Sequence, residues 1–211
     1  MNNFILVGCG GHCRSVLELL HSKDLFHKVH SIININPSSF TDNEFIRGVP
    51  VLNGLDELYN YSPSTYSPIL SIGDNKIRSS VFFELKKRGY ILPNLIHSNA
   101  YVSCTAVIGE GSLVFANSFL GDSATVGVSS ILNTSSVVEH ESIIHDFVHV
   151  APGSVICGRS SIHSYCLIGA NSTILPELSI AEDITIGASA TVTKSLLLPS
   201  KKYIGTPAVI L

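Results

Sequence analysis

The densest group of ionisable residues in the second half of the chain is Glu139-His140-Glu141. An imidazole can take up and release a proton near neutral pH, so His140 is a candidate general base. A carboxylate beside such a ring can orient it and stabilise its protonated form. The alternative is a surface histidine on one of many turns. The flanking acids make His140 the leading candidate for a base, while the surface histidine remains open at this point.

A second candidate site is the glycine-rich segment Gly8-Cys9-Gly10-Gly11-His12. It connects an apolar run to a helical pattern, and backbone N–H groups at a helix N-terminus suit a phosphate. The full dinucleotide pattern would need a third glycine where Cys13 stands, and an acidic residue where Asn34 ends the next strand. A nicotinamide cofactor is therefore disfavoured. A nucleotide diphosphate and simple close packing of strand and helix both remain open.

The elements around this turn alternate between strands and helices. Apolar runs predict strands at residues 4–8, 29–35 and 69–72, and helical patterns begin after residue 11 and cover residues 76–88. Such alternation is typical of a small parallel sheet. We therefore expect residues 1–93 to form a Rossmann-like α/β domain.

The second half of the chain repeats with a period of six residues. Seventeen consecutive positions at this spacing are Ile, Val or Leu, and small residues, mostly serine or alanine, recur four residues after them. The aliphatic positions are Ile96, Val102, Ile108, Val114, Leu120, Val126, Leu132, Val138, Ile144, Val150, Ile156, Ile162, Ile168, Ile174, Ile180, Ile186 and Val192. An α-helix would spread a six-residue repeat around its surface, whereas a hexapeptide β-helix requires this repeat.

Three hexapeptides close one triangular coil of about 18 residues, and neighbouring coils lie one strand spacing apart. Residues 94–211 should therefore form an all-β parallel β-helix domain. Gly158 follows His140 by one such coil, and Ala188 follows Ala170 by the same spacing, so each pair should stack on one corner. Because the flat faces of such a prism are usually covered by other subunits, we expect a homo-oligomer.

Composition limits the possible partners. The 211 residues are 45% hydrophobic and only 14% charged, with a formal charge of −3. This charge makes nucleic acid and anionic membrane surfaces unlikely partners. No apolar stretch reaches the roughly 18 residues of a membrane helix. The five cysteines form no CxxC pair and no export signal precedes them, so we expect a soluble, cytoplasmic protein with reduced thiols.

The ordered motifs resemble one family. They are Gly8-Cys9-Gly10-Gly11-His12, the segments 72–78 and 94–97, the run from Asn133 to Glu141, and Tyr203 to Ala208. Together they resemble bacterial hexapeptide-repeat sugar acetyltransferases, with the bacillosamine-pathway UDP-4-amino-sugar N-acetyltransferases nearest and sialic acid O-acetyltransferases close by. The resemblance implies a left-handed β-helix, a homotrimer with active sites between subunits, and acetyl-CoA as co-substrate without a metal.

The resemblance also assigns roles to residues. It implies that His140 is the base, that Glu141 orients it, and that the Gly158 N–H faces the acetyl carbonyl. It places His149, Gly158, Ala170 and Ala188 along acetyl-CoA.

On the sugar side, the resemblance implies that Gly10, Gly11, His12 and Gly73 receive the nucleotide sugar, and it places Asn34 and Ile35 in the same substrate-binding set. The family usually ends its second strand with two aspartates, and this chain has Asn34-Ile35 there. That departure leaves the sugar and its nucleotide open. Val209 replaces the basic residue that usually follows the Gly-x-Pro-Ala motif, so the CoA phosphates are expected to rely on Lys194, Lys201 or Lys202.

Three alternatives remain from the sequence. One is O-acetylation of a sialic-type sugar, and another is a non-catalytic β-helix scaffold. The third is a zinc site, because β-helix carbonic anhydrases place ligands at the spacing of Cys104, His140 and His145. Against it, His145 should stack on His163 as an imidazole ladder.

Overall fold

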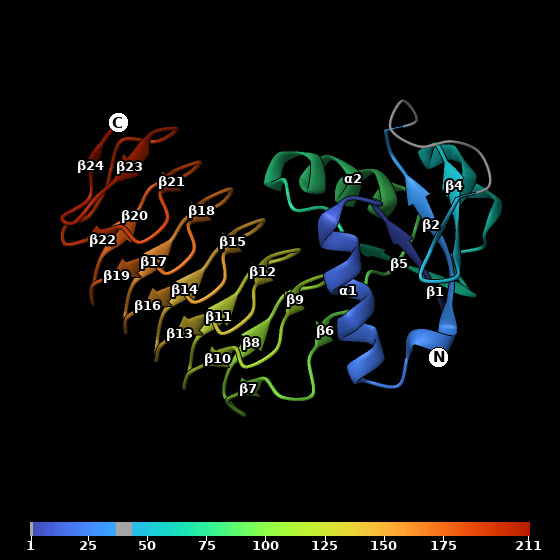
Figure 1. The fold of residues 1–211 in the computed structure, drawn as a ribbon. Helices are drawn as coiled ribbons and strands as arrows, with labels where there is room; N and C mark the ends of the chain where they lie inside the picture. Colours follow the sequence, from blue (N-terminus) through green and yellow to red (C-terminus); the bar gives the residue numbers. More distant parts are fainter. Residues whose placement is uncertain (1, 37–43) are drawn as a thin grey trace. The chain divides into compact units, whose positions relative to one another are not determined.

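The computed structural model describes residues 2–36 and 44–211. The chain divides into two compact units, Met1–Pro93 and Asn94–Leu211. Figure 1 shows an α/β arrangement in the first unit and regularly stacked short strands in the second. None of the helices in the described ranges has the length and apolar character needed to span a bilayer.

The first unit contains a five-stranded sheet in the order β3-β4-β2-β1-β5. The strands are β1 Asn3–Val7, β2 Val29–Asn34, β3 Phe45–Ile46, β4 Val49–Asn53 and β5 Tyr66–Leu70. Strands β1, β2, β4 and β5 run parallel, and β3 pairs antiparallel with β4. The predicted parallel sheet is confirmed, and its centre is apolar because β1 is buried from Phe4 to Val7. The short edge pair β3–β4 was not predicted.

Two α-helices accompany the sheet, α1 Gly11–Ser22 and α2 Asn75–Lys87, together with the 3₁₀ helices η1 Phe26–Lys28 and η3 Leu55–Asn60. Helix α1 buries one apolar stripe that includes Val16, Leu17 and Leu20, as helical spacing requires. Helix α2 begins after Asp74, whose carboxylate accepts hydrogen bonds from the N–H groups of the first helical turn. Helix α1 therefore begins shortly after the carboxyl end of β1, and helix α2 begins shortly after the carboxyl end of β5.

The second unit is a three-sided β-helix whose strands pair in parallel with those one coil away, except that β24 pairs antiparallel with β23 at the C-terminal end (Figure 1). One face holds β6 Leu95–Ile96, β9 Leu113–Val114, β12 Ile131–Leu132, β15 His149–Val150, β18 Leu167–Ile168, β21 Thr185–Ile186, β23 Lys202–Ile204 and β24 Val209–Ile210. The next holds β7 Tyr101–Val102, β10 Phe119–Leu120, β13 Val137–Val138, β16 Val155–Ile156, β19 Thr173–Ile174 and β22 Thr191–Val192. The third holds β8 Val107–Ile108, β11 Thr125–Val126, β14 Ile143–Ile144, β17 Ser161–Ile162 and β20 Ser179–Ile180.

The six-residue pattern is confirmed by the interior of this unit. Each predicted aliphatic residue is the second of its strand, and from Val114 to Val192 all are at most 3% exposed. Buried serines near the corners donate to carbonyls of the next coil, as Ser142 Oγ does to Cys157 O at 3.0 Å. Hydrogen bonds and aliphatic stacking thus hold the coils in register without charged surface.

From residue 111 to residue 189 a residue with positive φ recurs at every sixth position, so each of the three corners of a coil contains one. Ser123, Glu141, Arg159 and Glu177 have φ between 56° and 61° and follow one another at steps of one coil. The N–H of each of the last three donates to a carbonyl of the preceding coil; for example, Arg159 N donates to His140 O at 3.0 Å. This bond repeats from coil to coil and stacks the corner residues directly above one another.

Candidate active site

His140 and Glu141 lie on the turn between β13 and β14. The Nδ1 atom of His140 is 3.0 Å from Oε2 of Glu141. Hydrogen bonds from His140 and Arg159, with the Arg159 charge, hold the pKa of Glu141 below its ordinary value, so this carboxylate is an acceptor at neutral pH. A neutral His140 must therefore carry its proton on Nδ1. Its Nε2 is then left with the lone pair that a general base needs.

Gly158 lies directly beside the His140 ring, one coil further along. A Cβ at Gly158 would be 2.6 Å from both Cε1 and Nε2 of the imidazole. Only glycine at position 158 therefore allows the His140 ring to keep this position. The contact between the two residues agrees with their spacing of one coil in the sequence. Within the described residues, the Gly158 carbonyl accepts from Glu177 N while its own N–H donates to no backbone carbonyl. This N–H is therefore a candidate oxyanion donor beside the candidate base.

Arg159 is a charged member of this site that was not predicted. Its Nε is 3.0 Å from Oε2 of Glu141, the same oxygen that accepts from His140. Its Nη1 is 3.6 Å from Oε1 of Glu177. The residues one and two coils after Glu141 on the same corner are Arg159 and Glu177. This alternation of acidic and basic residues is the sequence signal that could have identified Arg159. Glu139, the other acid beside His140, is not its ion-pair partner among the described residues.

His149 is the outward-facing first residue of β15. Its Nε2 is 3.1 Å from Nδ2 of Asn133. Because Asn133 Oδ1 already accepts from Thr134 N at 2.8 Å, the Asn133 amide donates to His149. Asn133 thus holds the half-buried His149 ring at its Nε2 edge. Its expected contact with acetyl-CoA remains a prediction.

Ala170 and Ala188 occupy one corner of neighbouring coils. The N–H of Ser189 donates to the Ala170 carbonyl at 2.8 Å, which places the two alanines one coil apart. Ala170 is half-buried and Ala188 is exposed. Their small side chains leave this corner shallow, as binding of an extended ligand along it would require.

The first unit contains a cavity of about 530 Å³ at the carboxyl ends of β1, β2 and β5. It is lined by Gly8, Cys9, Gly10, Gly11, His12, Asn34, Ile35, Asn36, Ser71, Ile72 and Gly73. The structure therefore brings all six residues expected to bind the nucleotide sugar to one cavity. No atom lies within 4 Å of a Cβ built at Gly10, Gly11 or Gly73, so their backbones are open to a ligand. Such strand ends are where α/β sheets usually bind ligands.

Asn34 is a buried hydrogen-bonding centre at the edge of this cavity. Its Oδ1 accepts from Cys9 Sγ at 3.1 Å and from Asn36 N at 3.0 Å. Its Nδ2 donates to Asn53 Oδ1 at 2.9 Å. The amide thus ties β2 to β4 and to the glycine turn without adding charge. Asn34 shapes the cavity wall, and a direct contact with substrate remains a prediction.

The half-buried His12 lines this cavity, and the buried Arg78 lies behind the wall, where it bonds to the lining residues Ile72 and Gly73. Burial and the neighbouring Arg78 charge lower the pKa of His12 to about 4. Burial lowers the pKa of Arg78 to about 10. The Arg78 guanidinium donates to the carbonyls of Ile72 and Gly73 at 3.0 and 3.1 Å and to Asn75 Oδ1 at 2.7 Å. A buried cation behind this wall suits an anionic ligand such as a phosphate in the cavity. Arg78 lies within the 72–78 motif but was not singled out.

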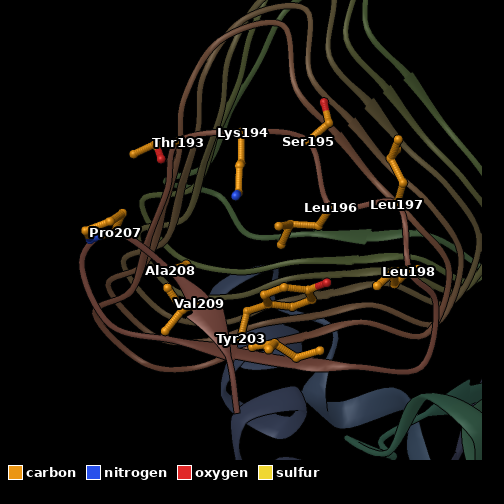
Figure 2. A pocket seen from close by; sticks show the side chains of 11 residues that line it. Thr193, Lys194, Ser195, Leu196, Leu197, Leu198, Tyr203, Pro207, Ala208 and Val209 are labelled. Carbon is orange, nitrogen blue, oxygen red and sulfur yellow. The ribbon is translucent and has the colours of Figure 1, made fainter.

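A second cavity of about 530 Å³ opens at the C-terminal end of the β-helix. Figure 2 shows Leu196 and Tyr203 on its walls, with Lys194 extending across the opening. Leu197 and Leu198, which also line it, are more than half exposed. Of the three lysines expected to bind the CoA phosphates, Lys194 lines this cavity, whereas Lys201 and Lys202 do not.

No three His, Cys, Asp or Glu side chains are grouped to hold a metal ion in the described parts of the chain. The ring of His145 instead stacks on His163, with centroids 4.6 Å apart and ring planes 8° apart. Burial and the His163 charge lower the pKa of His145. The predicted imidazole ladder is confirmed.

Comparison with known proteins identifies relatives of both units. Residues 3–85 match the PglD N-terminal domain family. UDP-N-acetylbacillosamine N-acetyltransferase of Bacillus subtilis (strain 168) is 28% identical over 115 residues, 54% of this chain. The match spans about half, 51%, of the length of that relative.

Two solved structures are similar over the whole chain. PerB from Caulobacter crescentus, in complex with CoA and GDP-perosamine, is 28% identical with a TM-score of 0.91, covering 100% of this chain and 98% of that one. The acetyltransferase domain of PglB from Neisseria gonorrhoeae FA1090, in complex with acetyl coenzyme A, is 27% identical with a TM-score of 0.91, covering 100% of both.

The order of an α/β unit followed by a β-helix is shared with PerB and with the acetyltransferase domain of PglB. Residues 3–85 are similar to the PglD N-terminal domain, and the chain over its full length is similar to these two acetyltransferase structures.

Proposed function

We propose that the protein transfers an acetyl group from acetyl-CoA to the amino group of a nucleotide-linked amino sugar, with His140 as general base. The observation that carries this proposal is the His140–Glu141 pair, which leaves His140 Nε2 unprotonated beside Gly158. The CoA and nucleotide-sugar complexes of the similar structures support it. The acceptor we expect is a UDP-4-amino-4,6-dideoxy sugar used in surface glycan assembly.

The chemistry needs a base and an oxyanion donor. The sugar amine attacks the thioester carbonyl and forms a C–N bond, and His140 Nε2 takes up one amine proton. The Gly158 N–H donates to the oxyanion of the tetrahedral intermediate. Collapse of that intermediate breaks the C–S bond, and the proton passes from the imidazolium to the CoA thiolate. Glu141 stabilises the imidazolium during this step.

The two ligands are assigned to different parts of the chain. Acetyl-CoA would lie along His149, Ala170 and Ala188, with its phosphates near lysines of the last coil. The nucleotide sugar would occupy the cavity at Gly10–His12 and Gly73. The buried charge of Arg78, which donates to the Gly73 carbonyl, would favour a diphosphate there. The proposed assembly is a homotrimer, and the proposed location is the cytoplasm, where acetyl-CoA and nucleotide sugars are both found.

The test measures thiol release from acetyl-CoA with a panel of UDP- and GDP-linked amino sugars and with sialic acids. His140→Ala should lower kcat about 10²- to 10⁴-fold while the Kd for acetyl-CoA changes less than about twofold. His163→Ala, which removes an exposed β-helix histidine outside the site, should leave kcat unchanged.

Near wild-type turnover by His140→Ala would refute His140 as the base. Turnover only with sialic acids would favour O-acetylation. Ligand binding without turnover on any acceptor would favour a scaffold, and stoichiometric zinc in the purified protein would overturn the metal-free mechanism.

A further inference from the structure

Arg159 and His140 share a single carboxylate oxygen. His140 Nδ1 and Arg159 Nε are each 3.0 Å from Glu141 Oε2, so this one oxygen joins the two side chains. A second bond joins the same residues through the backbone, because Arg159 N donates to His140 O at 3.0 Å. Arg159 is therefore attached to the turn of the candidate base at both its main chain and its side chain.

The Glu141 carboxylate needs such a partner to stay in place. Its side chain is 48% exposed, and an exposed carboxylate on its own samples several rotamers. Arg159 anchors it from the following coil, and the 3.6 Å contact of Arg159 with Glu177 anchors the guanidinium in turn. The stacking of residues 141, 159 and 177 on one corner makes this chain of contacts possible.

The tautomer of His140 depends on where that carboxylate lies. A free imidazole in water does not keep its proton on one nitrogen, and the hydrogen bond at one nitrogen decides which form is present. While Glu141 accepts from Nδ1, the base lone pair stays on Nε2, the atom next to Gly158. If Glu141 swings away, the proton can occupy Nε2 and the ring can no longer accept one there.

We propose that Arg159 is a positioning residue that holds Glu141 against His140 and thereby keeps the imidazole in the Nδ1–H form required for proton abstraction. This inference rests on the proposed function of His140. It adds a residue that does not touch substrate and that acts only through Glu141.

The test combines the tautomer with steady-state kinetics. Nitrogen-15 NMR of the full-length protein, at a pH where His140 is neutral, should show Nδ1–H in the wild type and a mixture of tautomers in Arg159→Ala. The kcat of Arg159→Ala should fall about three- to tenfold with little change in KM for either substrate, and Arg159→Lys should recover part of it.

Arg47→Ala is a matched control. Like Arg159, Arg47 is an exposed arginine with positive φ and one close ion pair, its Nη1 lying 2.7 Å from Glu18 Oε2. It lies outside both proposed sites, so its loss should move neither readout. The thermal midpoints of both variants should stay close to the wild type because both side chains are exposed.

The inference would be overturned if wild-type His140 carried its proton on Nε2, or if Arg159→Ala left the tautomer unchanged. It would also be overturned if Arg159→Ala changed the tautomer but left kcat unchanged. A rise in KM alone would also overturn it. These failures are distinct from failure of the proposed function, which would show as turnover by His140→Ala, whereas the NMR readout requires no activity.

Discussion

Gly158→Ala should separate catalysis from stability. The new Cβ would lie 2.6 Å from Cε1 and Nε2 of His140 and 3.1 Å from Cδ2, whereas ordinary contacts begin near 3.4 Å. The imidazole must therefore move by about 1 Å, and a displacement of that size at a reacting group costs on the order of 10²-fold in rate. Gly158 has no positive φ, so alanine fits its backbone, and the residue that gives way is an exposed side chain. The free energy of unfolding should change by less than about 1 kcal/mol.

Gly121→Ala provides the contrast. Its Cβ would lie 2.7 Å from the backbone N of His140, which cannot rotate away, so this variant should lose stability as well as rate. The assays are kcat for thiol release and the midpoint of thermal unfolding.

A double-mutant cycle tests the cause. If Gly158→Ala acts by moving the ring, it should cost nothing further in a His140→Ala background. An equal loss in that background would show that the methyl group obstructs the substrate instead. A kcat of Gly158→Ala within twofold of wild type, or cooperative unfolding of this variant at much lower temperature, would refute the packing argument.

Two further predictions concern stability. The folded protein holds His12 neutral down to about pH 4, whereas in the unfolded chain it takes up a proton near pH 6.5, so lowering the pH through this window favours unfolding. Urea unfolding should show wild type losing about 2 kcal/mol more between pH 7 and pH 5 than His12→Gln, and equal losses would contradict the buried neutral state. Ile162→Ala should cost about 2–5 kcal/mol because Ile162 is fully buried, whereas Ile143→Ala, 44% exposed, should cost under about 1 kcal/mol. Similar urea-unfolding midpoints for these two variants would refute the assignment of Ile162 to an inward position and Ile143 to an outward position.

The fold was predictable where spacing alone determines structure. Every aliphatic residue at the six-residue step became the inward position of a strand, because a β-helix has no other place for such a repeat. The pair β3–β4 was missed because β3 is two residues long, too short for any alternation to be seen. The spacing between His140 and Gly158 predicted their contact because it equals one full coil of the β-helix.

Side-chain pairing was less predictable than the backbone. Residue spacing did not distinguish Glu141 from Glu139 as the neighbour of His140. The family resemblance named Glu141, and its Oε2 lies 3.0 Å from His140 Nδ1. Arg159 contacts Glu141 because neighbouring coils stack their corner residues, and the contact becomes visible only when the sequence is followed coil by coil from the site. The role of Asn34 as an internal hydrogen-bonding centre depends on Asn53, which lies on the unpredicted strand β4.

Because the strands from β6 to β22 pair only with strands one coil before or after them, the length of the β-helix can change only in whole coils during evolution. If one whole coil were duplicated after the coils that contain the site, every later aliphatic residue of the six-residue repeat would still point into the interior. Inserting a single residue would turn every later aliphatic side chain out of its place. A coil duplicated between His140 and Arg159 would keep the fold but would move Arg159 away from Glu141 and His140. Natural variation in the number of coils should therefore not occur between residues 140 and 159.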